Sequence, residues 1–186
     1  MHRPTLEELE KIRSREHQAC EQLVLLHYRL VYSLQFRLVG NSEDAADLTQ
    51  ETFRAVWEKI DSFRGESDFS TWLYRLAYNV QVDWRRKCER KIVAIQQLNT
   101  DFEPEDKSAN NAAAQRLMDE DEKLHISRQI DRLEARDQEM IVLHYLQQLT
   151  IQQTAEVLGI AVGTAKWRLN QALGGLRRLL SADSTH

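Results

Sequence analysis

The chain has 186 residues, of which 42% are hydrophobic and 29% charged, and it contains only two prolines and six glycines. This composition is typical of a water-soluble protein rich in helix, and the length allows one domain or two small ones. We expect a cytoplasmic protein with reduced thiols, because no apolar run reaches the ~20 residues of a membrane span, the start lacks a signal-peptide pattern, and two cysteines cannot make a disulfide framework.

Three helices are predicted in the first half of the chain. Leucines three or four residues apart form an apolar stripe over residues 20–39, which Gly40 ends. Asn41 or Ser42 can cap a second helix, with acids in its first turn and a buried side formed by Leu48, Phe53, Val56, Trp57 and Ile60. After the turn-rich stretch 61–70, a third helix is predicted from about residue 71 to 95.

The second half begins with a predicted linker. Residues 99–114 contain Pro104, few large apolar groups and no helical period, so we expect them to be disordered at least in part. Helical periodicity returns from Leu117 to Leu146, and no alternating pattern long enough for a sheet is present. The pattern predicts an all-α protein of two small helical domains joined by a flexible acidic linker.

The net charge of −4 hides a local pattern. Residues 74–91 carry six basic residues against two acids, whereas residues 101–122 carry eight acids against two bases. The predicted helix that carries this basic segment, with the stretch just before it, also bears aromatic residues: Phe69, Trp72, Tyr74, Tyr78 and Trp84. Aromatic rings that stack on bases and cations that follow the backbone are typical of a single-strand binding surface, although core packing of some of these rings is the competing interpretation.

The last segment predicts a helix-turn-helix. Thr150 and Gln153 have capping-box spacing, Gly159 ends that helix, and a second helix begins near Val162. On the second helix four side chains able to contact bases or phosphates share one face: Lys166, Trp167, Asn170 and Gln171. Spacing alone does not distinguish this interpretation from an ordinary helical hairpin with a solvated polar face.

Two blocks resemble a known family. GNSEDAADLTQETFRAVWEKIDSFRG, followed by FSTWLYRLAYNVQVDWRR, resembles region 2 of the extracytoplasmic-function sigma factors of bacterial RNA polymerase, which belong to the sigma-70 family. LEARDQEMIVLHYLQQLTIQQTAEVLGIAVGTAKWRLNQALGGLRRLL resembles their region 4. The resemblance implies region 2 at 1–96, a linker at 97–120 and region 4 at 121–186. It also implies an alternative sigma factor that recognises a minus-35 duplex and melts and captures the minus-10 element.

The resemblance further implies a polymerase-binding surface. In this family the helix with the D-A-x-D-L-x-Q-E-x-F pattern docks on the clamp helices of the largest polymerase subunit, and region 4 binds the flap of the second subunit. The implied clamp-binding residues are Asp44, Asp47, Leu48, Gln50, Glu51 and Phe53. Helix-start acids alone would account for Asp44 and Asp47, but not for Gln50 and Glu51.

Promoter DNA is the second implied partner, and an anti-sigma factor is the third. The implied minus-10 contacts are Phe69, Trp72, Tyr74, Arg75, Asn79, Arg85 and Arg86. The implied minus-35 contacts are Thr164, Lys166, Trp167, Arg168, Asn170 and Gln171. The chain departs from the family pattern at Ala46 in region 2 and at Ala161, Trp167 and Gln171 in region 4.

Two other classes of protein share part of this sequence pattern. A stand-alone helix-turn-helix regulator with a sensing domain would explain residues 150–180, but it leaves the region 2 pattern unexplained and predicts a dimer. A di-metal helical bundle needs two Glu-x-x-His pairs, and the chain has that spacing only at Glu122 and His125. We expect no enzymatic activity, no metal, no cofactor and no membrane insertion.

Overall fold

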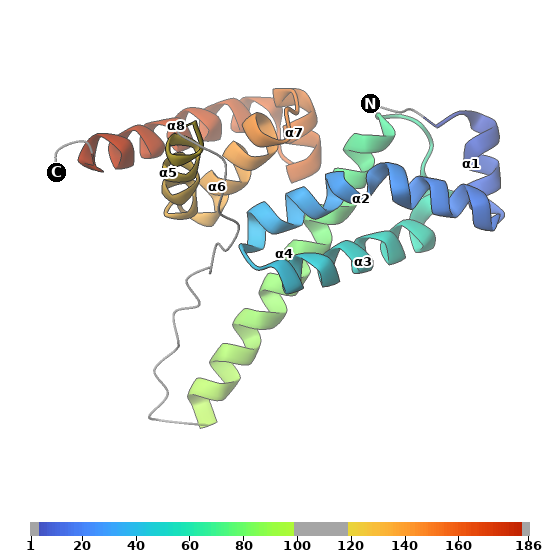
Figure 1. The fold of residues 1–186 in the computed structure, drawn as a ribbon, viewed down its shortest axis with the longest axis horizontal. Coiled ribbons are helices and arrows are strands. Elements are labelled where there is room, and N and C mark those ends of the chain that lie inside the picture. The colour runs from blue at the N-terminus through green and yellow to red at the C-terminus, as the bar shows by residue number, and fades with distance from the viewer. Residues whose placement is uncertain (1–3, 99–118, 184–186) are drawn as a thin grey trace. The chain divides into compact units, whose positions relative to one another are not determined.

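A computed structural model describes residues 4–98 and 119–183, and throughout these ranges the regular structure is helical (Figure 1). The chain divides into two compact units, residues 1–111 and 112–186. The predicted all-α fold with two small helical domains is therefore confirmed. Most of the predicted linker lies outside the described residues, which extend to Leu98 on one side and resume at Asp119 on the other.

Over residues 4–98, the described part of the first unit, the chain forms four α-helices and one short turn of 3₁₀ helix. Its elements are α1 (Leu6–Arg13), α2 (His17–Val39), α3 (Ser42–Lys59), η1 (Ile60–Ser62) and α4 (Phe69–Leu98). Helices α2, α3 and α4 pack against one another, and the C-terminal half of α4 extends beyond the other two (Figure 1). Of the two predicted caps for α3, Asn41 makes the bonds, since its Oδ1 accepts hydrogen bonds from the backbone N–H groups of Glu43 and Asp44.

Helix α1 was not predicted. Thr5 and Glu8 close a capping box at its start, with the Thr5 backbone N–H donating to Glu8 Oε2 at 2.7 Å. Arg13 donates a hydrogen bond to the carbonyl of Phe63 at 2.7 Å, and Arg15 donates one to the carbonyl of Trp57. These bonds hold the N-terminal segment against the end of α3 and the loop that follows it.

A buried glutamine joins the three long helices of the first unit. Gln35 is fully buried on α2, and its Nε2 donates to Thr52 Oγ1 at 3.2 Å on α3 and to the Ala77 carbonyl at 3.0 Å on α4. Because a buried donor without a partner is costly, these two bonds favour one arrangement of the helices. The exposed faces of α3 and α4 are positioned by this packing.

Tyr74 is the largest fully buried side chain among the described residues of this unit. Burial raises the pKa of its hydroxyl from an ordinary value of 10.0 to about 12, and the nearby charge of Arg37 partly offsets this rise. Because the folded pKa is the higher one, stability is complete below pH 10 and falls as the pH rises through 12. We expect a loss on the order of 1 kcal/mol in the free energy of unfolding at pH 11 relative to neutral pH. Denaturant unfolding at both pH values should show this loss in the natural chain and a smaller one in Tyr74→Phe.

The second unit places a long helix against three shorter ones. Its elements are α5 (Asp119–Asp131), α6 (Ala135–Ile141), the π-helical turn η2 (Val142–Leu146), α7 (Ile151–Leu158) and α8 (Val162–Asp183). Helix α8 packs on α5, α6 and α7 around a core that includes Ile130, Met140, Ile141, Ala155, Ala165 and Ala172. No helix within the described ranges is long and apolar enough to cross a membrane.

The predicted helix-turn-helix is present as α7 and α8. Thr150 and Gln153 form the predicted capping box, with Thr150 Oγ1 accepting from the Gln153 backbone N–H at 3.2 Å. Gly159 adopts a left-handed backbone with φ of 65°, which glycine tolerates without strain. The backbone N–H of Ile160 then donates to the Ala155 carbonyl at 3.0 Å. This sharp turn lets α8 start at Val162, as the sequence predicted.

Candidate polymerase and promoter interfaces

The outward face of α3 is rich in acids. Asp47, Gln50 and Glu51 are exposed, and Asp44 is half-buried beside them. The structure adds Arg54 to this face, where its guanidinium lies 3.4 Å from Glu51 and 3.4 Å from Glu58. Exposed pairs of this kind contribute little to stability, so the charges remain available for a partner. Arg54 lies three residues after Glu51, and Glu58 lies four residues after Arg54, so helical spacing could have identified Arg54 and Glu58.

Two members of the predicted polymerase-binding set, Leu48 and Phe53, lie on the inward side of α3. Leu48 is 3% exposed and Phe53 is 6% exposed. Both belong to the inward stripe of α3, which packs on α2 and α4. The prediction that they form the buried side of this helix is confirmed. Because both side chains are buried, they are not part of the exposed candidate contact surface, and they pack beneath the acids instead.

Helix α4 presents four of the predicted minus-10 residues on one side. Trp72, Arg75, Asn79 and Arg86 follow one another at spacings of three, four and seven residues, which places them on a single helical face. Arg75, Asn79 and Arg86 are exposed, and Trp72 is half-buried. Arg86 lies 3.6 Å from Asp83 on the same face. Arg85 is half-buried and lies about 100° further round the helix from Arg86.

Two predicted minus-10 aromatics belong to the core instead. Phe69 is 1% exposed and Tyr74 is 2% exposed, so neither ring has surface left for a base. Phe69 packs at ring-centroid distances of 5.3 Å from His27, 5.4 Å from Phe63 and 5.5 Å from Trp72. The competing core interpretation therefore applies to these two residues. Trp72 packs on the same aromatic cluster, with 5.2 Å between its ring centroid and that of Phe63, but it is only half-buried.

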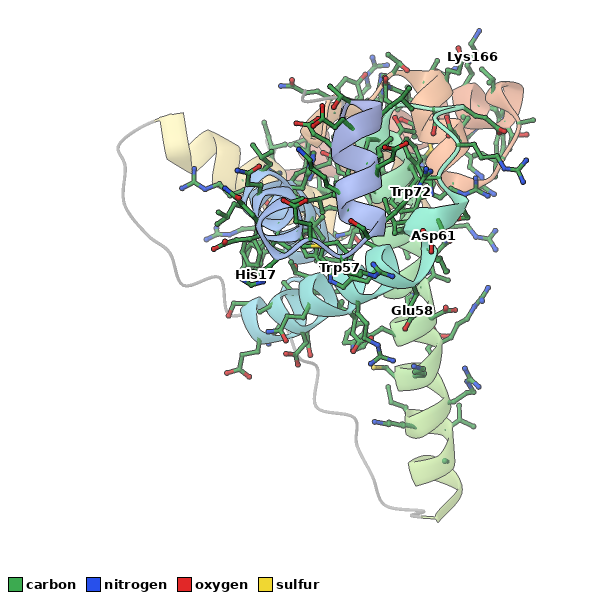
Figure 2. All side chains as sticks on the ribbon, turned by 90° about the vertical axis from the view of Figure 1, so that its right-hand side faces the viewer. His17, Trp57, Glu58, Asp61, Trp72 and Lys166 are labelled. Atoms are coloured by element: carbon green, nitrogen blue, oxygen red, sulfur yellow. The ribbon has the colours of Figure 1, made fainter. Side chains whose placement is uncertain are left out.

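Helix α8 carries the predicted minus-35 residues on its solvent side. Thr164, Lys166, Trp167, Asn170 and Gln171 are exposed, and Figure 2 shows Lys166 projecting outward from the helix. Arg168 is half-buried and close enough to α6 for its charge to act on Asp137, whose pKa is raised by burial and by Glu134 and lowered by Arg168 and Arg178. Arg168 is thus positioned at the flank of the outward face.

The start of α8 lacks a side-chain cap. The Ala161 carbonyl accepts from the Ala165 backbone N–H at 3.0 Å, as an N-cap residue does, but its methyl group offers no acceptor to the next free N–H groups. Ala161→Ser should stabilise α8 by about 1 kcal/mol and slow amide exchange along its first three turns about fivefold.

Hydrogen exchange of the full chain measures this effect. Ala182→Ser makes the same chemical change in the last turns of α8 and should leave exchange in the first three turns unchanged. Equal protection from both substitutions would contradict the capping argument.

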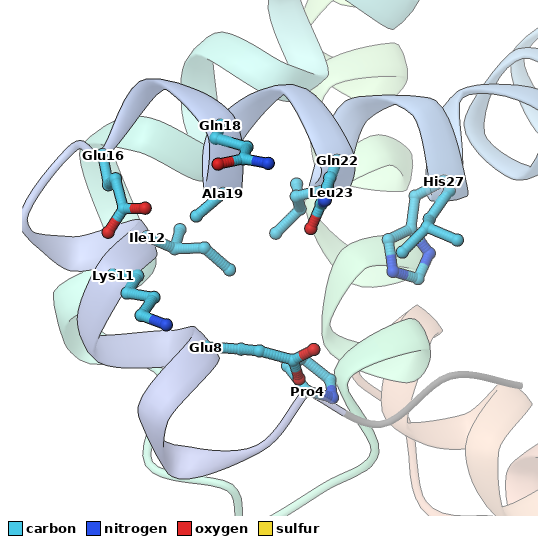
Figure 3. A pocket seen from close by; sticks show the side chains of 11 residues that line it. Pro4, Glu8, Lys11, Ile12, Glu16, Gln18, Ala19, Gln22, Leu23 and His27 are labelled. Carbon is cyan, nitrogen blue, oxygen red and sulfur yellow. The ribbon is translucent and has the colours of Figure 1, made fainter.

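A cavity of about 290 Å³ lies between α1 and α2 (Figure 3). Its lining includes Glu8, Lys11, Glu16, Gln22 and His27, and none of the predicted site residues borders it. Among the residues with described side chains, no group of three or more His, Cys, Asp or Glu side chains is arranged to hold a metal ion.

Comparison with known proteins identifies both units. Residues 23–91 match Sigma-70 region 2, and residues 124–174 match Sigma-70, region 4. The chain is 28% identical to the ECF RNA polymerase sigma factor SigW of Bacillus subtilis, over 92% of this chain and 94% of that protein. It is 30% identical to the ECF RNA polymerase sigma-E factor of Escherichia coli, over 88% of this chain and 87% of that protein.

A solved structure has a similar fold. The sigma factor RpoE of Bartonella quintana, crystallised with the anti-sigma factor NepR, is 25% identical with a TM-score of 0.66, over 88% of this chain and 97% of that one. Regions 2 and 4 in this order define the chain as a sigma-70 protein. It belongs to the ECF sigma factors, as the sequence predicted, and is an alternative sigma factor that directs promoter-specific transcription.

Proposed function

We propose that this sigma factor contacts polymerase and promoter DNA through three exposed helical faces, on α3, α4 and α8. The proposal is supported by the way in which each predicted set of residues divides between the surface and the core. The polar members lie on exposed or half-buried faces, whereas Leu48, Phe53, Phe69 and Tyr74 pack inside the first unit. Residues that need contact with a partner are therefore accessible, and the apolar ones hold them in position.

The α3 face is the proposed polymerase contact. Asp47, Gln50 and Glu51 supply carboxylate and amide groups, with Asp44 beside them and Arg54 between Glu51 and Glu58. Charge-assisted hydrogen bonds to basic side chains of a partner helix suit such a face. The partner is the clamp-helix segment of the largest subunit of core polymerase, and region 4 adds a contact with the flap of the second subunit.

The α4 face is the proposed minus-10 surface. Arg75 and Arg86 can follow the phosphates, Asn79 can bond to base edges, and the exposed part of Trp72 can stack on an unpaired base. Arg85, on an adjacent face, adds positive charge. Flipping a base costs a few kcal/mol, which stacking and pocket contacts offset.

The outward face of α8 is the proposed minus-35 surface. Lys166 and Arg168 are placed to contact phosphates, whereas Asn170 and Gln171 can read base edges. Thr164 lies in the first turn of α8, close to the helix N-terminus, where backbone N–H groups favour a phosphate. The second helix of a helix-turn-helix enters the major groove through its N-terminal residues.

Regulation by an anti-sigma factor is part of the proposal. It is supported by the RpoE–NepR co-crystal structure, in which a relative is bound to one. We propose that the chain acts in the cytoplasm, with residues 97–120 linking the two DNA-binding regions. No enzymatic step is assigned to it.

Reconstitution with bacterial core polymerase tests the proposal. The chain should join the core enzyme and direct initiation from a subset of promoters of its own genome, which transcript mapping identifies. Failure to bind core polymerase, combined with dimeric binding to paired DNA half-sites, would favour a stand-alone regulator instead.

A further inference from the structure

Trp167 has an unusual position for a large aromatic residue. It is 62% exposed on α8, although Ala165, Leu169 and Ala172 of the same helix face the core of the second unit. With 100° per residue, Trp167 lies roughly opposite these three positions. The indole therefore projects from the centre of the outward face and contributes little to the core.

The neighbours of Trp167 along this ridge are small or polar. Gly163 lies one turn before it and Gly174 two turns after it, and open space surrounds the position where a side chain would begin at either glycine. Asn170 and Gln171, one turn after it, are exposed. Trp167 is thus the most prominent apolar group near the start of α8, and a surface that meets this face must cover it.

The chemistry of the indole ring limits which base Trp167 can distinguish. Its only polar group is one N–H donor, and the rest of its surface is apolar. In the major groove the one apolar group that distinguishes a base pair is the C5-methyl group of thymine. Lys166, Asn170 and Gln171 already provide the polar groups that read other base edges.

We infer that Trp167 determines part of the minus-35 sequence by packing its indole on the C5-methyl group of a thymine. This inference rests on the proposed function of α8. It adds one specific element, a thymine preference at one position of the duplex that depends on an apolar contact. A ring that lies instead along the sugar–phosphate backbone would add affinity without any preference for a base.

A binding selection with the full chain tests the inference. A pool of duplexes randomised over the minus-35 segment is selected with the natural chain, Trp167→Ala, Trp167→Phe and Tyr145→Ala. Tyr145 is a matched control, because it is an exposed aromatic of the same unit outside α8. We expect the natural chain and Tyr145→Ala to select thymine equally strongly at one position. Trp167→Phe should select it more weakly, and Trp167→Ala should show no preference there.

The methyl group itself is then removed. Replacing the selected thymine by deoxyuridine keeps the base pair and deletes only the C5-methyl group. The natural chain should bind this duplex about fourfold more weakly, which is the effect of one buried methyl group. Trp167→Ala should bind the two duplexes equally, since it lacks the contact.

The outcomes separate this inference from the function on which it rests. If Trp167→Ala weakens binding to all sequences equally and deoxyuridine has no effect, the ring contacts the backbone and the inference is wrong, while the proposed role of α8 stands. If the natural chain selects no sequence at all, the proposed minus-35 function of α8 is itself wrong. Circular dichroism of each variant should show unchanged helix content, because Trp167 lies outside the core.

Discussion

Glu51→Lys combined with Gln50→Ala should lower the affinity of the chain for core polymerase roughly a hundredfold, or by about 3 kcal/mol. The charge reversal places a cation where the proposed partner surface is basic, and the second change removes the neighbouring amide. Both side chains are exposed on α3, so helix content and unfolding should remain close to those of the natural chain. Fluorescence titration of labelled core polymerase measures the affinity.

A matched control is available on α2 of the same unit. Glu21→Lys with Gln22→Ala makes the same two chemical changes at adjacent exposed positions outside the proposed contact. It should leave polymerase affinity within about twofold of the natural value. Equal losses from both double variants would indicate a general charge effect, and no loss from the α3 variant would remove this face from the proposed interface.

Local chemistry made much of the fold predictable. The Asn41 cap, the Thr150–Gln153 capping box and the Gly159 turn each depend on residues within a few positions, and the structure contains all three. Helix α1 has an equally local signal in Thr5 and Glu8, but its eight residues carry too short an apolar period to indicate a helix by periodicity.

Contacts between distant segments could not be predicted in this way. Arg13 and Arg15 bond to carbonyls 50 and 42 residues away, and Gln35 joins helices whose relative register no spacing rule gives. A buried glutamine also contradicts the usual preference of this side chain for the surface. Such bonds form only after the helices have packed.

The candidate sites show the same limit. A family motif names residues on both faces of a helix, so it groups the exposed Asp47 and Glu51 with the buried Leu48. The helical period of α3 separates the two groups once the core-facing side is known. For Phe69 and Trp72 the period is less informative, because these rings lie at the start of α4 and pack with a loop residue, Phe63.

Arg75→Ala combined with Asn79→Ala should reduce open-complex formation on a duplex promoter roughly a hundredfold, or by about 3 kcal/mol. The two exposed side chains lie one turn apart on the outward face of α4, and each hydrogen bond involving a charged group contributes about 1.5–3 kcal/mol. Binding to an isolated minus-35 duplex should be unchanged, since that contact belongs to α8 in the second unit. Gln22→Ala with Arg29→Ala removes the same kinds of group from exposed positions on α2 and should have little effect on either measurement.

Templates with a preformed minus-10 bubble separate strand opening from base capture, because they remove the unpairing cost but keep the single-strand contacts. If Arg75 and Asn79 hold the unpaired strand, the defect persists on the bubble template and weakens as salt rises, since phosphate contacts are screened. A defect confined to the duplex template would instead assign the two residues to strand opening. If the double variant impaired minus-35 duplex binding as strongly as open-complex formation, the division of labour between α4 and α8 would be wrong.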